Sequence, residues 1–196
     1  MDIVFIRHGK TQLNDLGCFI GNTDCDISEE GLRQAEKVKG FLDKFSFDGI
    51  YVSPLKRTIQ TANILSKKYI LDDRLREMNF GVFEGLNYEE IKQKYPDYLR
   101  LWNEDYENYR IPNGESLQDL FDRVEDFIKD VKRKHKRVLV VTHGGVIRCA
   151  LSLTFSSREF FYKFRIDPGS VSIVEYDGDF GFIKGIYNLL YSGKHR

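Results

Sequence analysis

Long hydrophobic runs, paired cysteines and an excess of charge of one sign are all missing from this 196-residue sequence. The apolar run before Arg7 is too short for a signal peptide, and no stretch reaches the roughly 18 apolar residues that a membrane span needs. The three cysteines form no C-x-x-C pair, which argues against a disulfide framework and against a zinc knuckle. These absences predict a cytoplasmic protein without a membrane partner.

The charge balance excludes a further class of partners. Thirty Lys and Arg residues offset thirty Asp and Glu residues, so the chain lacks the net charge that favours nucleic acid or anionic lipid. The basic run Lys132–Arg137 is the one segment suited to a phosphate backbone. Its place at the end of a predicted helix favours solvated charge that compensates the helix dipole. We therefore expect no nucleic-acid partner.

Short apolar strands alternate with amphipathic helices along the chain, and neither a linker nor a repeat interrupts them. The predicted strands are Asp2–Ile6, Gly49–Val52, Val138–Val141 and a final hairpin of Val171–Tyr176 with Phe182–Tyr187. The predicted helices start after Ser28, cover Leu55–Lys67 with Ser53-Pro54 as cap and first-turn pair, cover Glu115–Lys134, and start again at Gly144. This order predicts one α/β domain over 1–196, a three-layer α/β/α sandwich around a mostly parallel mixed sheet.

Several common catalytic motifs are absent. Gly9-Lys10-Thr11 imitates the end of a Walker A loop, but the required earlier glycine position is Val4. The sequence contains no G-x-G-x-x-G, G-x-S-x-G or H-E-x-x-H pattern, and its four histidines include no close pair. Dinucleotide binding, serine hydrolysis and a dedicated zinc site are therefore disfavoured.

Basic side chains do follow three of the predicted strands. Arg7-His8 comes directly after the first strand, Arg57 follows the second, and His143-Gly144 follows the third at a helix start. Each signal alone is more often structural. Ligands of open α/β sheets bind beyond the carboxyl ends of the strands, so the four cationic groups are expected to converge there. Arg, imidazolium and helix N-terminal amides together suit phosphate.

Four ordered motifs carry a resemblance to the histidine phosphatase superfamily, with its phosphoglycerate-mutase-like fold, from Asp2 to about Leu190. They are R-H-G-x-T-x-x-N at Arg7–Asn14, S-P-L-x-R-T-x-Q-T-A at Ser53–Ala62, L-x-E-x-x-F-G-x-x-E-G at Leu75–Gly85 and T-H-G-G at Thr142–Gly145. The resemblance implies hydrolysis of a small-molecule phosphate ester through a phosphohistidine intermediate.

The resemblance also implies a role for individual residues. His8 would be the nucleophile and Glu77 the proton donor, with Glu84 as a competing acid whose place before Gly85 looks structural. The implied phosphate-binding residues are Arg7, Arg57, His143, Asn14, Thr11, Gly21 and Gly144. Because cationic side chains do the work of a metal here, no metal and no cofactor are expected.

The segment 86–114 is predicted to be a small helical cap, and it bears on the substrate. Six Tyr and Trp residues fall within it, and they either pack the insertion on the sheet or stack on a flat leaving group. Glycolytic mutases are longer and carry an extra basic stretch there, so the scattered Lys and Arg of this segment favour a phosphatase over a phosphoglycerate mutase.

Two stretches, less specific than the four motifs, resemble the α-ribazole phosphatase branch, which acts in cobalamin assembly. They are the stretch from Trp102 to Ser116 and the stretch Phe164–Gly169. α-Ribazole 5′-phosphate is therefore the first substrate hypothesis, although Lys10 replaces an acidic residue that many relatives carry. The alternatives are a phosphoglycerate mutase, a broad-specificity sugar-phosphate phosphatase and, remotely, an inactive phosphate-binding scaffold. A homodimer is one assembly that the sequence leaves open.

Overall fold

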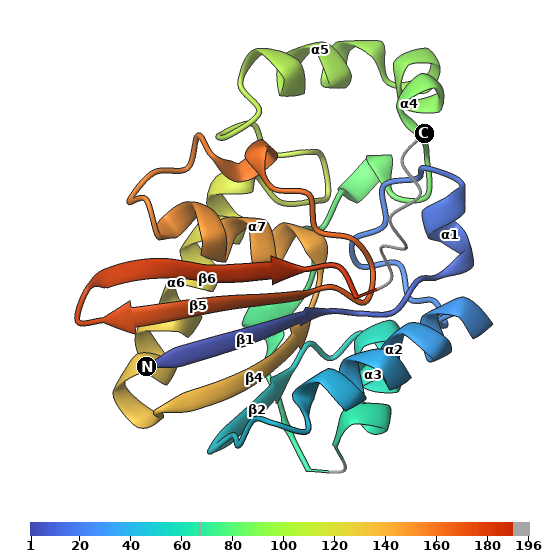
Figure 1. Cartoon of the computed structure of the whole chain (residues 1–196). Helices are drawn as coiled ribbons and strands as arrows, with labels where there is room; N and C mark the ends of the chain where they lie inside the picture. Colours follow the sequence, from blue (N-terminus) through green and yellow to red (C-terminus); the bar gives the residue numbers. More distant parts are fainter. Residues whose placement is uncertain (67, 190–196) are drawn as a thin grey trace, which may run out of the picture.

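The computed structural model describes residues 1–66 and 68–189, which fold around a six-stranded sheet of order β3-β2-β4-β1-β5-β6 (Figure 1). The strands are β1 (Asp2–Arg7), β2 (Gly49–Val52), β3 (Ile70–Leu71), β4 (Arg137–Thr142), β5 (Val171–Asp177) and β6 (Phe180–Tyr187). The first four run parallel to one another, β5 runs antiparallel to β1, and β6 runs antiparallel to β5. The predicted mostly parallel mixed sheet is thus confirmed. Leu190, the end of the resemblance, lies outside the described residues.

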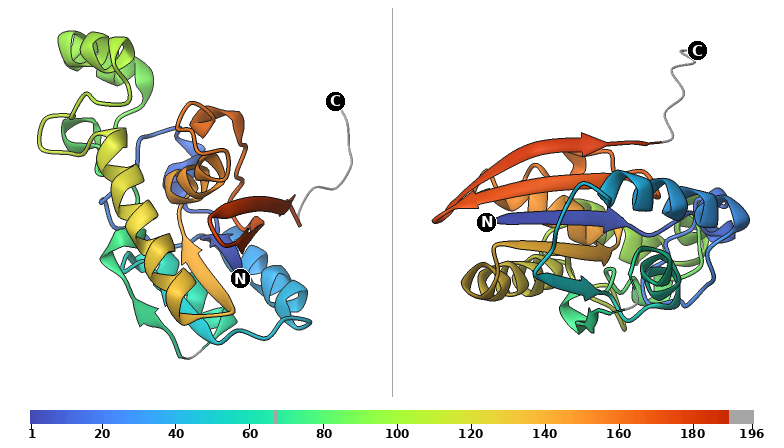
Figure 2. Two further views of the ribbon diagram at one scale, coloured as in Figure 1. Left: turned by 90° about the vertical axis from the view of Figure 1, so that its left-hand side faces the viewer. Right: turned by 60° about the horizontal axis from the view of Figure 1, so that its bottom comes forward.

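Helices cover both faces of this sheet (Figure 2). On one face lie α6 (Leu117–Lys134) and α7 (Gly144–Leu153), and on the other lie α2 (Glu29–Leu42) and α3 (Lys56–Leu65). Successive strand residues alternate between the two cores, so that Phe5 packs with α6 and Ile6 packs with α2. Both are fully buried, which explains why the sequences of the central strands are unbroken apolar runs.

The helix starts follow the sequence signals at two places and depart from them at a third. Ser28 caps α2 by accepting from the N–H of Gly31, and Ser116 forms a capping box with Asp119 at the start of α6. The prediction that Ser53-Pro54 caps α3 is wrong, because its N-cap is Leu55, which makes no side-chain cap bond. The helix also ends at Leu65, and Lys67, its predicted end, lies outside the described residues.

The segment 86–114 holds two helices, α4 (Tyr88–Lys94) and α5 (Pro96–Glu104), and is called the cap below. The cap projects from the body beyond the carboxyl ends of the parallel strands (Figures 1 and 2). Trp102 anchors it, with its ring 5.6 Å from Phe19 and 5.9 Å from Phe83 of the body. The remaining short elements are α1 (Gln12–Asp15) and the 3₁₀ turns η1 (Asp73–Leu75), η2 (Gly81–Phe83) and η3 (Phe161–Lys163).

Within the described part of the chain, no helix has the length and apolar character to cross a membrane. The basic run at the end of α6 is partnered by carboxylates. Lys134 lies 2.7 Å from Asp130, and Arg137 lies 2.8 Å from Asp2. Surface pairs of this kind contribute little to stability. They neutralise part of the positive charge of the basic run.

Candidate active site

The two strands at the middle of the sheet bring two histidines together. β1 and β4 pair in parallel with Arg7 opposite Thr142, so His8 and His143 leave the sheet at the same edge. The main-chain N–H of His8 donates to the Thr142 carbonyl at 3.0 Å. The two imidazole rings then meet edge to face, with their centroids 5.2 Å apart, and both side chains are buried. The convergence predicted from the strand ends is what the structure shows.

A main-chain carbonyl fixes the tautomer of His8. Its Nδ1 lies 2.8 Å from the oxygen of Gly9. A carbonyl oxygen only accepts hydrogen bonds, so Nδ1 must carry the proton of the neutral ring. The lone pair of the neutral imidazole is therefore on Nε2, the atom that a nucleophilic histidine needs free.

The two arginines add positive charge beside these rings. Arg57 on α3 is 1% exposed and donates to the carbonyls of Gly21 at 2.7 Å and Thr23 at 2.9 Å. Arg7 donates from Nη1 to the carbonyl of Ile166 at 2.6 Å. These carbonyl partners orient the guanidinium groups without neutralising their charge. Buried cationic groups held in this way favour an anionic ligand.

The same surroundings keep the histidines neutral. Burial lowers the pKa of His8 well below its ordinary value, and the charges of Arg7 and Arg57 lower it further. Burial also lowers the pKa of His143, as do Arg57, His8 and Arg7. Because a neutral imidazole is the nucleophilic form, the electrostatics agree with the tautomer of His8.

Two buried nitrogen atoms of this cluster lack a hydrogen-bond partner in the described structure. They are Nε of Arg7 and Nδ1 of His143. The other ring nitrogen of His143, Nε2, lies 2.8 Å from the hydroxyl of Ser53. Orphaned polar atoms at this depth are rare in native proteins. Both can donate to an oxygen of a bound phosphoryl group.

The Glu77 carboxylate lies at the start of α7. It accepts from the N–H of Gly145 at 3.0 Å and from the N–H of Met78 at 3.0 Å. A Cβ at position 145 would overlap this carboxylate, so the Glu77 side chain could not keep its present position. The geometry places one carboxyl group at the first turn of α7, where it can exchange a proton with a bound ligand.

Glu84, the competing acid, accepts more hydrogen bonds than Glu77 does. Its carboxylate accepts from the main-chain N–H groups of Gly21, Asn22, Thr23 and Phe80 at 3.0–3.1 Å, and from the Thr23 hydroxyl at 2.6 Å. A carboxylate that accepts this many hydrogen bonds is fixed in place and has little freedom to approach a bound substrate. The contacts favour a structural role for Glu84 and leave Glu77 as the candidate acid.

The remaining candidate residues divide into two groups. Gly21 and Gly144 lie at the cluster, because Gly21 supplies a carbonyl to Arg57 and a Cβ at Gly144 would stand 3.5 Å from Nε of Arg7. Thr11 and Asn14 instead form the capping box of α1, with Thr11 N donating to Asn14 Oδ1 at 2.9 Å. The contacts of these two side chains thus stabilise the helix that follows His8, and their phosphate-binding role stays a prediction.

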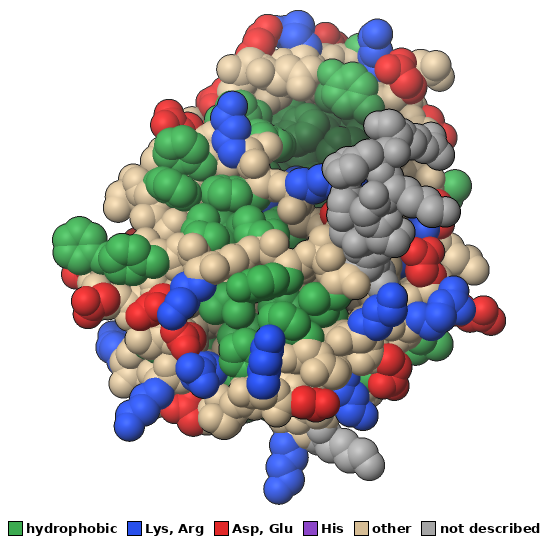
Figure 3. All heavy atoms as spheres, viewed as in Figure 1, with side chains coloured by type: hydrophobic (Ala, Val, Ile, Leu, Met, Phe, Trp, Pro, Cys, Tyr) green, Lys and Arg blue, Asp and Glu red, His purple; other side chains and the backbone are tan. Residues whose placement is uncertain are grey.

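A cavity of about 380 Å³ adjoins Glu77 and extends under the cap. In the space-filling view, hydrophobic side chains line a hollow below the cap (Figure 3). Tyr88, Trp102 and Tyr106 reach it from the cap, and Gly145 and Arg148 reach it from α7. The indole Nε1 of Trp102 is buried without a partner. The packing expectation holds for Trp102, which contacts the body, and stacking of the cap aromatics on a leaving group stays a prediction.

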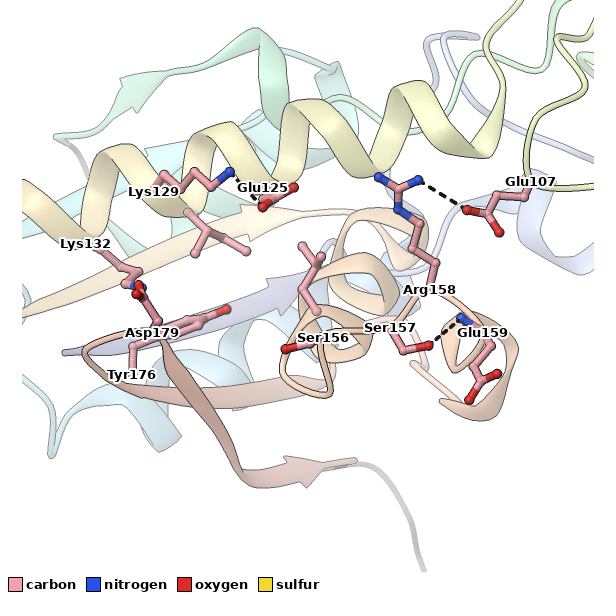
Figure 4. A pocket seen from close by; sticks show the side chains of 12 residues that line it. Glu107, Glu125, Lys129, Lys132, Ser156, Ser157, Arg158, Glu159, Tyr176 and Asp179 are labelled. Carbon is pink, nitrogen blue, oxygen red and sulfur yellow. Dashed lines mark hydrogen bonds and ion pairs between the residues drawn. The ribbon is translucent and has the colours of Figure 1, made fainter.

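A larger cavity of about 760 Å³ lies elsewhere, between α6 and the β5–β6 hairpin (Figure 4). Its charged side chains form ion pairs with one another, since Lys129 lies 2.7 Å from Glu125 and Lys132 lies 3.3 Å from Asp179. With its charge internally balanced, this cavity offers a phosphate group less than the His8 cluster does.

Two further side chains position the cluster, and sequence reasoning missed their roles. Ser53 contacts His143, although its place before proline suggested a helix cap. Thr61 accepts from the N–H of Gly9 at 3.0 Å and donates to the Arg57 carbonyl at 2.8 Å, which ties the end of β1 to α3. Both lie inside the second motif, Ser53–Ala62, and that motif was the available signal.

Comparison with known proteins agrees with this geometry. A model of the histidine phosphatase superfamily (branch 1) matches residues 3–188. Phosphoserine phosphatase 1 of Hydrogenobacter thermophilus is 34% identical over 181 residues, which cover 88% of this chain and 85% of that protein. The 6-phosphofructo-2-kinase/fructose-2,6-bisphosphatase of Gallus gallus is 38% identical over 164 residues, which cover 82% of this chain and 34% of that protein.

A solved structure gives the same result for the fold. The alpha-ribazole phosphatase from Shigella flexneri matches with a TM-score of 0.88 at 28% sequence identity, covering 96% of this chain and 97% of that chain. The three similar proteins are named for three different phosphate esters. The reaction class is therefore common to them, and the leaving group is what distinguishes them.

Proposed function

The chain belongs to the histidine phosphatase superfamily and is a phosphatase. We propose that it hydrolyses α-ribazole 5′-phosphate, an alkyl phosphate whose alcohol carries a flat aromatic base, through a phosphohistidine on His8. The observation that carries this proposal is the position of Glu77, which lines the cavity under the cap and interacts electrostatically with Arg7 of the cationic cluster. On one side lies the cationic cluster, which suits the phosphoryl group. On the other lies the aromatic-walled cavity, which suits a flat leaving group.

In the first step, Nε2 of His8 attacks phosphorus in line, the P–N bond forms and the P–O bond to the leaving group breaks. Negative charge spreads over the equatorial phosphoryl oxygens, where Arg7, Arg57 and His143 stabilise it. An alkoxide is a poor leaving group, and protonated Glu77 therefore gives its proton to the departing oxygen. The step ends with a phosphorylated His8, a free alcohol and ionised Glu77.

In the second step, water enters the place that the alcohol has left. Ionised Glu77 removes a proton from this water as its oxygen attacks phosphorus, and the P–N bond breaks. Inorganic phosphate leaves, His8 regains its free Nε2, and Glu77 is protonated again for the next turnover. The carbonyl of Gly9 retains the Nδ1 proton throughout both steps.

The cavity supports the aromatic leaving group. Tyr88 and Tyr106 present exposed ring surface, and Trp102 offers an indole N–H that has no partner within the described residues. A planar base that carries one hydrogen-bond acceptor satisfies both features, since it stacks on aromatic faces and accepts from the indole.

Hydrolysis of phosphoserine is a second candidate, and Arg148 is the observation that favours it. This residue lines the cavity and donates from Nε to the Phe164 carbonyl at 3.1 Å, which leaves its terminal amino groups for a ligand. A guanidinium at that place suits a substrate carboxylate. The relative from Hydrogenobacter thermophilus named phosphoserine phosphatase 1 adds to this candidate.

The covalent step is tested by rapid quenching with ³²P-labelled substrate. We expect acid-labile, base-stable label on the wild-type protein and none on His8→Ala. Hydrolysis of p-nitrophenyl phosphate by His8→Ala at the wild-type rate would overturn the mechanism. Appreciable transfer of phosphate between the positions of phosphoglycerate, with only trace hydrolysis, would make the protein a mutase.

The leaving group is tested by kcat/KM for α-ribazole 5′-phosphate, phosphoserine and 3-phosphoglycerate. We expect the first to exceed the others by at least about tenfold, and Tyr106→Leu to reduce that preference. Tyr98→Leu is the matched control, because Tyr98 is equally exposed on α5 but lies against Tyr95 and does not line the cavity. A preference for phosphoserine that is lost in Arg148→Met would support the second candidate.

A further inference from the structure

The segment that carries Glu77 has little secondary structure of its own. It follows the short turn η1, which ends at Leu75, and it precedes η2, which begins at Gly81. Residues 76–80 between them belong to no helix or strand. Their main-chain groups therefore need partners from elsewhere in the molecule, and those partners determine where the Glu77 carboxyl group stands.

One side chain of α6 supplies most of these partners. Arg123 donates from Nη1 to the carbonyls of Arg74 at 2.8 Å and Arg76 at 2.6 Å, and from Nη2 to the carbonyl of Glu77 itself at 3.1 Å. Three carbonyls within four residues thus converge on a single guanidinium group. A planar fork of fixed donors restricts their relative positions in a way that a flexible ammonium group does not.

Glu115 completes the arrangement from the other side. Its two carboxylate oxygens accept from Nε and Nη2 of Arg123, each at 3.0 Å, and one of them also accepts from the N–H of Asn79 at 2.8 Å. The N–H of Glu115 in turn donates to the Asn79 carbonyl at 2.8 Å. All five guanidinium donors of Arg123 are used, and both side chains are mostly buried.

We propose that Arg123 and Glu115 are positioning residues for the general acid, holding the 74–79 main chain so that Glu77 faces the oxygen that leaves phosphorus. This inference rests on the proposed role of Glu77. Neither side chain needs to touch the substrate. Arg123 reaches the main chain of Glu77 from α6, whereas the Glu77 carboxyl group points to Gly145 at the start of α7.

A misplaced acid has a signature that general destabilisation lacks. An alkyl phosphate has a poor leaving group that must receive a proton, and general acid catalysis contributes about 10²–10⁴-fold to such steps. The p-nitrophenolate ion leaves without protonation at neutral pH. Loss of the acid therefore lowers kcat/KM, which reports formation of the phosphohistidine, for alkyl phosphates and spares it for p-nitrophenyl phosphate. Loss of folded protein lowers both equally.

The experiment compares kcat/KM for an alkyl phosphate and for p-nitrophenyl phosphate in Arg123→Met, Arg123→Lys and Glu115→Gln. We expect Arg123→Met to lower the alkyl rate at least about tenfold more than the aryl rate. Arg123→Lys keeps the charge but not the fork, and should show the same bias. Arg110→Met is the matched control, since Arg110 pairs with Asp119 near the start of α6 and should change neither ratio.

Glu77→Gln separates the failure of this inference from the failure of the proposed function. If Glu77→Gln shows the alkyl-selective loss and the Arg123 and Glu115 variants do not, the positioning role is wrong. If Glu77→Gln itself shows no selectivity, Glu77 is not the acid and the proposed mechanism loses the proton donor of its first step. Should Arg123→Met fold poorly, Glu115→Gln carries the test, because its amide oxygen still accepts from Asn79.

Discussion

Arg57 and Glu84 both bind the three-residue turn Gly21–Thr23, Arg57 through the turn's carbonyl groups and Glu84 through the turn's N–H groups. Glu84 accepts from the N–H groups of all three residues, and Arg57 donates to the carbonyls of the first and the third. The turn thus links an anion to a cation that do not touch each other. Through it, Glu84 sets the position of a guanidinium group in the phosphate pocket.

Replacing Glu84 by glutamine tests this link. The amide has one acceptor oxygen and presents an NH₂ group to main-chain donors, so one or two N–H groups lose their partner, at about 1–3 kcal/mol each. We expect kcat/KM to fall at least about tenfold for every phosphate ester, whatever its leaving group, and the inhibition constant of vanadate to rise in parallel. Glu89→Gln, an exposed change on α4, is the control. Equal vanadate affinity in Glu84→Gln and wild type would contradict the prediction.

Gly145→Ala should disable the acid without replacing a catalytic side chain. A Cβ at this position overlaps the Glu77 carboxylate and must displace it or the start of α7. We expect an alkyl phosphate to lose at least about tenfold in kcat/KM while p-nitrophenyl phosphate loses much less. Gly40→Ala on α2 has open space around its Cβ and serves as the control. An equal loss for both substrates would point instead to damage in the phosphate pocket.

The buried neutral histidines predict how stability depends on pH. The folded-state pKa of His8 and of His143 lies well below the unfolded value of about 6.5. Below that pH the unfolded chain binds protons that the folded chain refuses, so the free energy of unfolding falls as the pH is lowered. Urea titrations at several pH values should show this slope reduced in His8→Asn, by up to about 1.4 kcal/mol per pH unit between pH 6 and 5. An unchanged slope would mean that His8 protonates freely in the fold.

Because Arg7 and Arg57 supply positive charge and His143 supplies an N–H donor to the proposed transition state, turnover should survive metal removal. We expect kcat of the protein dialysed against excess EDTA to match that of untreated protein. A loss that Mg²⁺, Mn²⁺ or Zn²⁺ restores would assign the phosphoryl charge to a metal ion. Loss of activity without restoration would require a folding control by circular dichroism.

The convergence of the cluster was predictable because it follows from strand order. His8 and His143 each come directly after a buried apolar strand, and such strands occupy the middle of a parallel sheet. The carbonyl that fixes the tautomer of His8 belongs to the very next residue, Gly9, which no strand or helix pattern indicates.

The supports of the cluster were not predictable in the same way. Ser53 meets His143 across 90 positions of sequence, and Arg123 meets the Glu77 carbonyl across 46. No periodicity or local spacing encodes contacts of that separation. Local signals even misled at Ser53, because a serine before proline suits a helix cap as well as it suits a histidine partner.

The cap and the cationic cluster are built by different parts of the chain. Cap residues line the cavity beside Glu77, whereas His8, Arg57 and His143 come from the ends of the sheet or the helices beside it. New substrates can therefore be sought by exchanging residues 86–114 as a unit, with Trp102 kept to seat the insertion against Phe19 and Phe83.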